Sequence, residues 1–177
     1  MKHQHKNISC RLAAAVMAGA MMVSMVGMTA FAEGSTSPIT GNGESGISSI
    51  DITKTITTDG NTYAPNTTFT ITVTEGVGKT FNDGNGDVTA LPGVAGGLLG
   101  ATITSTPDTD ELTSGSYSFY GALTVDIKAF ADATPGVYHY VVSETTGDYE
   151  GIDYDTTDYD LYLYLMRNEN TNEKYIG

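Results

Sequence analysis

The chain has 177 residues and a formal net charge of -13, because 21 acidic side chains outnumber 8 Lys and Arg residues. This acidity excludes a basic footprint for nucleic acid. The single cysteine, Cys10, can supply neither a disulfide framework nor a cysteine-rich metal site, and the length suits one domain of ordinary size.

The first 32 residues have the three parts of a secretory signal peptide. Three bases form a positive front, an apolar run follows from Leu12 to Met28, and Ala30-Phe31-Ala32 provides an A-x-A cleavage pattern. An uncleaved membrane anchor is the alternative, because the apolar run is near the lower length limit for a spanning helix. In either case we expect residues 33–177 to be exported and to lie at the cell wall or cell surface.

Cleavage after residue 32 would change the net charge of the chain and the reactive side chains that it contains. It would remove three bases and no acid, so the mature charge is 5 minus 21, or -16. It would also leave His139 as the one histidine and no thiol. A cysteine nucleophile, a zinc cluster and a Ser-His-Asp triad thereby lose their usual residues, although His139 alone could still act as a base. We therefore expect no metal and no cofactor.

The exported part divides into a leader and one β domain. Residues 33–47 are rich in Gly, Ser, Thr, Pro and Asn and predict a flexible leader, whereas residues 48–177 contain short β-type runs without helices. This pattern favours an antiparallel sandwich. The predicted strands are 50–56, 69–74, 101–105, 117–119, 123–127, 137–143 and 159–166, and the predicted core includes Ile50, Ile52, Ile56, Phe69, Ile71, Val73, Leu161, Leu163 and Leu165.

Two segments of this domain have other expectations. Residues 76–100 are glycine-rich and poorly periodic, which predicts a surface excursion. Residues 167–173 predict a hairpin loop, and residues 174–177 read as the opening of a further strand. We therefore expect the domain to lack its last strand within this chain.

Lys54 and Glu144 are the unusual residues of the predicted strands. By period-two alternation, Lys54 points to the same side as Ile52 and Ile56, and Glu144 continues the face that carries Tyr140. A lysine on the core side is costly unless it is neutralised, paired or consumed by a reaction. The alternative is a snorkelling lysine and a strand-end glutamate in water.

The remaining candidate sites have simpler explanations. Residues 76–80 lack the glycine spacing of a phosphate loop and predict a turn, and residues 83–87 break the EF-hand pattern and predict an Asn-Gly turn. The acidic stretch 144–160 could in principle perform glycoside hydrolysis, but acidic loops are usually solvated. The tyrosines that could form an adhesive face are more often cross-strand pairs, and they are Tyr138, Tyr140, Tyr149, Tyr154, Tyr159, Tyr162 and Tyr164.

Three segments together resemble a known family. They are Ile52-Thr53-Lys54-Thr55-Ile56, the segment 131–144 with its Pro-Gly-x-Tyr-x-Tyr strand ending in Glu144, and the Tyr-Asp-x-Thr step within 152–159. The pattern is similar to the pilin isopeptide-linkage domain of streptococcal-type backbone pilins and related Gram-positive surface proteins. The resemblance runs from about Ser48 to the C-terminus, and residues 76–115 contribute little to it.

The resemblance implies an immunoglobulin-like, CnaB-type sandwich with a spontaneous isopeptide bond. In that family a lysine of the first strand bonds to an asparagine of the last strand, and a buried glutamate promotes the reaction. Lys54 matches the lysine and Glu144 the glutamate. Burial in apolar surroundings favours a neutral amine and a neutral carboxylic acid, which suits a nucleophile and a proton shuttle.

The chain departs from the family at its end. The acceptor asparagine is expected beyond Gly177, because the asparagines nearest the end, Asn168, Asn170 and Asn172, lie in the predicted hairpin loop. Neither an LPxTG-type sorting signal nor a Tyr-Pro-Lys pilin motif is visible, so the polymerisation lysine stays open.

The expected function is structural and not enzymatic. The leading hypothesis is a pilus subunit or stalk module that crosslinks itself once and joins other pilin subunits or surface-protein domains through sortase. The alternatives are an adhesin that binds a host ligand through its tyrosine-rich acidic loops and, more weakly, a secreted carboxylate hydrolase.

Overall fold

The computed structural model describes residues 8–13, 46–57, 65–106, 116–149 and 152–177, and almost all of its regular structure is β. A single short 3-10 helix, η2, occurs among these residues. The elements are β1 (Ile8–Ala13), β2 (Ser49–Thr57), β3 (Thr67–Glu75), β4 (Lys79–Asn82), β5 (Asp87–Pro92), β6 (Leu98–Leu99), β7 (Ala101–Ser105), β8 (Ser116–Val125), η2 (Ile127–Phe130), β9 (Gly136–Glu144), β10 (Ile152–Asp153), β11 (Tyr159–Arg167) and β12 (Lys174–Ile176).

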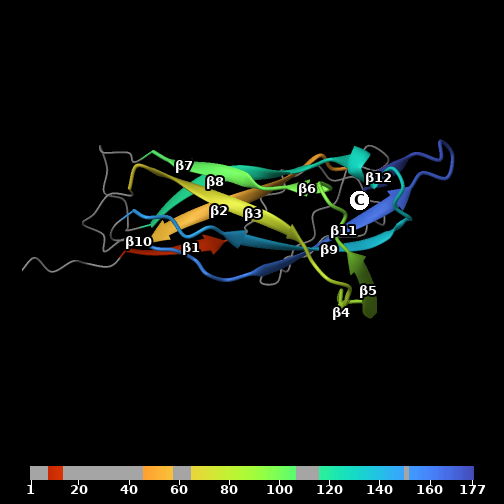
Figure 1. The fold of residues 1–177 in the computed structure, drawn as a ribbon, viewed down its shortest axis with the longest axis horizontal. Coiled ribbons are helices and arrows are strands. Elements are labelled where there is room, and N and C mark those ends of the chain that lie inside the picture. The colour runs from red at the N-terminus through yellow and green to blue at the C-terminus, as the bar shows by residue number, and fades with distance from the viewer. Residues whose placement is uncertain (1–7, 14–45, 58–64, 107–115, 150–151) are drawn as a thin grey trace, which may run out of the picture.

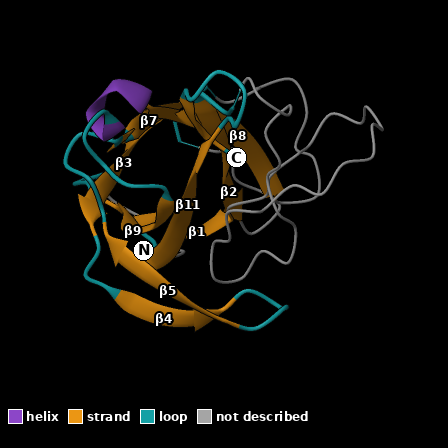
Figure 2. Ribbon diagram, turned by 90° about the vertical axis from the view of Figure 1, so that its right-hand side faces the viewer, coloured by secondary structure: helices purple, strands orange, loops and turns teal. Residues whose placement is uncertain are grey.

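The strands form two sheets that face each other along the long axis of the molecule (Figure 1). One sheet has the order β10-β1-β2-β8-β6, and the other has the order β12-β11-β9-β3-β7. The hairpin β4–β5 branches off the second sheet, where β5 pairs with β9 (Figure 2). The predicted all-β sandwich is thereby confirmed, and its arrangement is consistent with an immunoglobulin-like fold.

The core lies between the sheets and contains the predicted residues. Ile56, Leu123 and Leu163 are fully buried, and Phe130 of η2 covers part of one end. Val73 is partly buried and packs against the cluster. The other predicted core residues are all buried and are Ile50, Ile52, Phe69, Ile71, Leu161 and Leu165.

Most predicted strands occur within one or two residues of their expected bounds, and two expectations were wrong. Residues 117–119 and 123–127 were expected as separate strands, but 116–125 form the single strand β8. Gly121 lies between the two expected strands and pairs with Ile52, and a Cβ there would lie 2.7 Å from Ile103 Cγ1. A glycine therefore permits β7 and β8 to approach closely.

The second wrong expectation concerns residues 76–100, which were expected to be an irregular excursion. They contain β4, β5 and β6. The apolar face of β4–β5 packs on the outer side of β9 and β11, where Ala90 contacts Tyr162 and Tyr164 in a second, smaller core. The pattern was missed because each strand is too short to establish a period.

A strand from the predicted signal peptide lies at the edge of β2. β1 pairs with β2 antiparallel, with Leu12 in register with Lys54, and with β10 in parallel. Residues 1–32 were predicted to be a signal peptide that is not part of the fold. The rest of that segment and most of the leader 33–47 lie outside the described residues, so the signal peptide and the leader stay predictions. β1 shows that the edge of β2 can accept a further strand.

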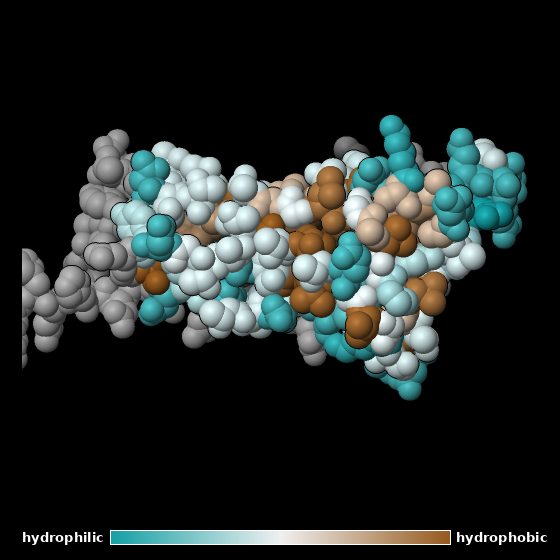
Figure 3. Space-filling view, in the orientation of Figure 1, coloured by the Kyte–Doolittle hydropathy of each residue, from teal (hydrophilic) through white to brown (hydrophobic). Residues whose placement is uncertain are grey.

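The face drawn in Figure 3 is mainly polar, with apolar residues scattered mostly over its middle and its right-hand part. The hydrophilic tip at the far end is the loop between β11 and β12, whose residues 169–173 are exposed. Both the hairpin loop and the following strand, β12, were predicted. In the described part of the chain, no helix has the length and apolarity needed to span a membrane.

Candidate functional site: a buried lysine and glutamate

Lys54 and Glu144 meet inside the sandwich, although they lie on different sheets. Lys54 is in the middle of β2, and Glu144 is the last residue of β9. Lys54 Nζ donates to Glu144 Oε2 at 2.6 Å. Neither side chain has any exposed surface. The snorkelling alternative is therefore wrong, since both head groups are held away from water.

Apolar and aromatic groups surround the lysine. Its Nζ lies 4.7 Å from the centre of the Phe69 ring, so the ring face contributes a cation–π contact if the amine is charged. On the β8 side, Phe119 is in register with Lys54. Tyr154 packs against the far side of this group, with its ring 6.0 Å from that of Phe69. The amine thus has a single ionisable partner among its described contacts.

The electrostatics of Glu144 favour its neutral form. Burial raises the pKa of Glu144 above its ordinary value of 4.5, and the hydrogen bond and charge of Lys54 only partly oppose this effect. The nearby Asp155 carboxylate raises the pKa of Glu144 further, while the Asp155 backbone amide lowers it slightly. A neutral carboxylic acid beside an amine is one protonation state of this pair, and it has no net charge to desolvate.

One oxygen of Glu144 lacks a partner. Its Oε1 atom is buried and has no hydrogen-bond partner among the described residues. A buried polar atom without a partner typically costs about 1–3 kcal/mol. Glu144 Oε1 can therefore form a hydrogen bond with one more polar group beside the amine.

The arrangement is suited to acyl transfer onto the lysine. A desolvated neutral amine is a nucleophile, and an adjacent carboxylic acid can protonate a carbonyl oxygen and later accept the proton that the amine loses. The third reactant would have to be a carboxamide or carboxyl group. Its side chain must enter from the β1 side of β2, because β8 already occupies the other side.

The loop asparagines are not near this pair. Asn168 lies at the end of β11, where its Oδ1 accepts hydrogen bonds from the Asn170 and Thr171 amides and so organises the loop. The Asn172 side chain accepts a bond from Arg167. The side chains of Asn168 and Asn172 thus make their hydrogen bonds within the β11–β12 connection.

Most tyrosines of the proposed adhesive face are inside the protein. Tyr138, Tyr140, Tyr162 and Tyr164 are buried, while Tyr149 is exposed. The structure therefore places most of these rings in packing contacts.

The segment that was compared with an EF-hand loop forms a turn, as predicted. Residues 83–86 form the β4–β5 turn, in which Asp83 accepts hydrogen bonds from two backbone amides. Among the described residues, no group of three or more His, Cys, Asp or Glu side chains is placed to hold a metal ion.

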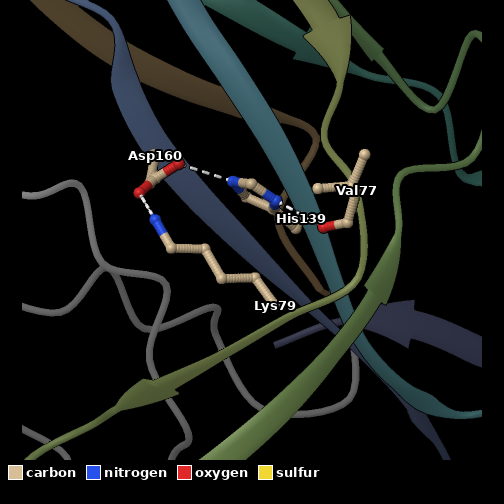
Figure 4. A network of polar contacts seen from close by, with 4 residues as sticks. All are labelled: Val77, Lys79, His139 and Asp160. Atoms are coloured by element: carbon tan, nitrogen blue, oxygen red, sulfur yellow. Dashed lines mark hydrogen bonds and ion pairs between the residues drawn. The ribbon is translucent and has the colours of Figure 1, made fainter.

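A second polar network, which the sequence did not reveal, lies under the β4–β5 hairpin. The His139 Nε2 atom lies 2.6 Å from Asp160 Oδ1, and the other carboxylate oxygen of Asp160 contacts Lys79 (Figure 4). The His139 Nδ1 atom lies 2.8 Å from the Val77 carbonyl oxygen. In the sequence, the only sign of this network is that His139 faces outward in β9. Its partners could not be identified from the sequence, because they are 21 and 62 residues away along the chain.

Comparison of the chain with protein-family models, with curated proteins and with solved structures finds no match, so the geometry of the Lys54–Glu144 pair has to carry the functional argument.

Proposed function

We propose that the chain is an exported surface-structure protein, a pilus subunit or stalk module, whose Lys54 forms an intramolecular isopeptide bond with an asparagine. The observation that supports this most directly is the fully buried contact between Lys54 and Glu144. A buried ion pair is weak support for stability, because its desolvation penalty can exceed the Coulombic gain. A reactive role gives such a costly pair a reason to exist.

The reaction balances without any external reagent. The Lys54 amine attacks the carboxamide carbon of the asparagine, while the neutral Glu144 carboxyl group donates a hydrogen bond to the amide oxygen. Glu144 then takes a proton from the attacking amine and passes it to the leaving amide nitrogen. The new C–N bond forms, the old C–N bond breaks, and ammonia leaves.

The register of β2 indicates where the acceptor would lie. Residues directly opposite each other in an antiparallel pair have neighbouring side chains on the same face of the sheet. In β1 the residue opposite Lys54 is Leu12. If signal peptidase removes β1, a strand that carries the acceptor asparagine can pair with the same edge and present this asparagine to Lys54.

Such a bond would stabilise the module mechanically and thermodynamically. Closing a loop of more than 100 residues restricts the unfolded chain by about 4–5 kcal/mol on the entropy model used for disulfides. The bond also joins the first strand to the strand beside it, so tension on the termini would bypass the sheet hydrogen bonds. Unlike a disulfide, it needs no oxidant.

Intact mass tests the proposal. A protein extended through the next strand is expected to be lighter than its sequence by one ammonia, and Lys54→Ala or Glu144→Ala should restore the full mass. Lys79→Ala is the matched control, because Lys79 also contacts a carboxylate but lies at the surface. An extended wild type with no deficit would overturn the assignment of Lys54 and Glu144.

A fragment of residues 33–177 provides a second comparison with the extended protein. Residues 33–177 should show no mass deficit, and a deficit there would point to Asn168, Asn170 or Asn172 as acceptor. Without β1, this fragment has an open edge at β2, which invites association. We therefore expect trypsin to digest it faster than the extended protein, and equal resistance would count against a missing strand.

The adhesin alternative is less well supported. It relied on exposed tyrosines, and four of the seven tyrosines considered are buried. The acidic loop residues can still contribute surface charge, but nothing in the described contacts selects a ligand for them.

A further inference from the structure

The His139 network holds the β4–β5 hairpin against the outer face of the second sheet. Besides the short pairing of β5 with β9, the hairpin contacts the body through Lys79, which reaches Asp160 on β11, and through Phe81, which stacks on Tyr162 with ring centres 3.7 Å apart. The His139 ring stacks on the same tyrosine at 5.1 Å. Aromatic stacking and a chain of polar contacts therefore both hold the hairpin against β9 and β11.

The hydrogen-bond partners of His139 define the protonation state that this closed arrangement needs. A backbone carbonyl oxygen can only accept, so Nδ1 must carry a proton to satisfy the Val77 carbonyl. An ionised carboxylate can also only accept, so Nε2 must carry a proton to satisfy Asp160. Both nitrogens are donors only in the imidazolium form.

The ionised state of Asp160 is supported separately. Burial alone would raise the pKa of Asp160, but hydrogen bonds and charge from Lys79 and His139 outweigh it and hold that pKa below its ordinary value of 3.8. The carboxylate is thus charged over most of the pH range and cannot donate to a neutral imidazole. A neutral ring would leave either the carbonyl or the carboxylate facing an unprotonated nitrogen.

The ring cannot move aside without disturbing the hairpin. Its side chain is 4% exposed, and a Cβ atom on Gly76, at the start of the connection to β4, would overlap the ring. The Gly76 amide donates to the His139 carbonyl oxygen at 2.9 Å. The connection and the ring are therefore packed as one unit.

We infer that protonated His139 is a clamp for the β4–β5 hairpin, and that deprotonation of this ring loosens the hairpin from β9 and β11. The charged and titratable groups at the ring are Asp160 and Tyr162 on β11 and, through Asp160, Lys79 on β4. Glu75, at the end of β3, is exposed and pairs with the neighbouring residue of β9, Tyr140.

The clamp is tested by following the ring and the hairpin in one titration from about pH 5 to about pH 9, the range in which histidines change charge. Nitrogen NMR of the full chain reports the protonation of both ring atoms, and His139→Gln identifies the signals among the three histidines. Hydrogen exchange reports the protection factors of the β4 and β5 amides, with those of β3 and β7 as the internal reference.

We expect protection of β4 and β5 to fall about tenfold or more as the ring deprotonates, which matches the cost of one buried polar group that loses its partner. The reference strands should keep their protection. In His139→Gln the hairpin protection should no longer depend on pH in this range. A closed hairpin with a neutral ring, or hairpin protection that is unchanged through the ring titration, would overturn the inference.

Discussion

Two lysine–carboxylate contacts in this protein differ in their surroundings. Lys54 and Glu144 have 0% exposed side chains, whereas Lys79 and Asp160 are 44% and 16% exposed. The first contact joins the two sheets through the core. The second fastens a hairpin to the outside of one sheet. Similar residue types thus serve two different physical purposes.

The two carboxylates respond to their environments in opposite directions. Burial is the largest influence on each, and it raises the pKa of Glu144 above 4.5 even beside a lysine. At Asp160, hydrogen bonds and charge from Lys79 and His139 overcome burial and lower the pKa. Burial therefore sets the direction of the pKa shift at Glu144, whereas the partners of Asp160 set it there.

The largest expected effect is the loss of one partner in the core. Lys54→Ala leaves Glu144 buried without its hydrogen-bond donor, and removing one member of a buried pair typically costs about 3–5 kcal/mol. Replacing both residues, as Lys54→Met with Glu144→Leu, should recover most of this loss because no polar group is then buried. Urea unfolding of the full chain measures both. Equal losses in the single and double variants would assign the cost to packing volume instead of charge.

A smaller effect is expected at the hairpin connection. Gly76→Ala places a methyl group in the His139 ring and should cost about 1–3 kcal/mol, the usual range for overpacking. Gly78→Ala is the matched control, since its nearest contact would be the Ala90 carbonyl oxygen at an ordinary 3.4 Å. Thermal unfolding compares the two variants. Similar melting temperatures would show that the ring can be displaced without cost.

The pH dependence of stability should separate the two carboxylates by sign. Because the folded-state pKa of Glu144 is raised, its contribution is present below pH 4.5 and is lost as the pH rises through the folded value. Because that of Asp160 is lowered, its contribution is present above pH 3.8 and is lost as the pH falls through the folded value.

Two single variants make this comparison measurable. Glu144→Gln should remove a decline in unfolding free energy toward higher pH, and Asp160→Asn should remove a decline toward acid. Urea unfolding at a series of pH values gives both curves. If the two variants altered the same limb of the curve, the contrast between the sites would fail.

The smallest effect is expected for the exposed lysine. Lys79→Met removes the contact with Asp160 but leaves the aromatic stacking of the hairpin in place. Partly exposed ion pairs contribute about 0–1 kcal/mol, so the unfolding free energy should change by no more than this. The same measurement in high salt should reduce the difference further. A loss of unfolding free energy as large as that of Lys54→Ala would show that the Lys79–Asp160 contact is as important for stability as the buried contact.

Particular residues show how much the sequence could predict. The alternation in 50–56 placed Lys54 on the core side, and the same argument placed Glu144, so the inward direction of both side chains was predictable from the sequence. Their contact at 2.6 Å was not, because period-two reasoning gives the face of a strand but not the partner sheet. The resemblance supplied the pairing as an expectation.

The hairpin region was less predictable for a local reason. β4 and β5 have four and six residues, and their apolar residues cover a sheet whose position depends on residues about 50 to 80 positions later. The role of His139 depends in the same way on Val77 and Asp160. The sequence shows only a single histidine on the outward face of a strand, and its partners become apparent only when the hairpin is folded over it.

The sequence by itself determined the all-β character, most strand positions, the core faces and the inward direction of Lys54, because these follow from local alternation and turn chemistry. The tertiary structure decided which sheet meets which, that Glu144 Oε1 has no hydrogen-bond partner among the described residues, and that the edge of β2 takes a further strand. Those properties depend on contacts between residues far apart in the chain, where burial and hydrogen-bond geometry change the behaviour of a lysine or a carboxylate without any change in its local sequence.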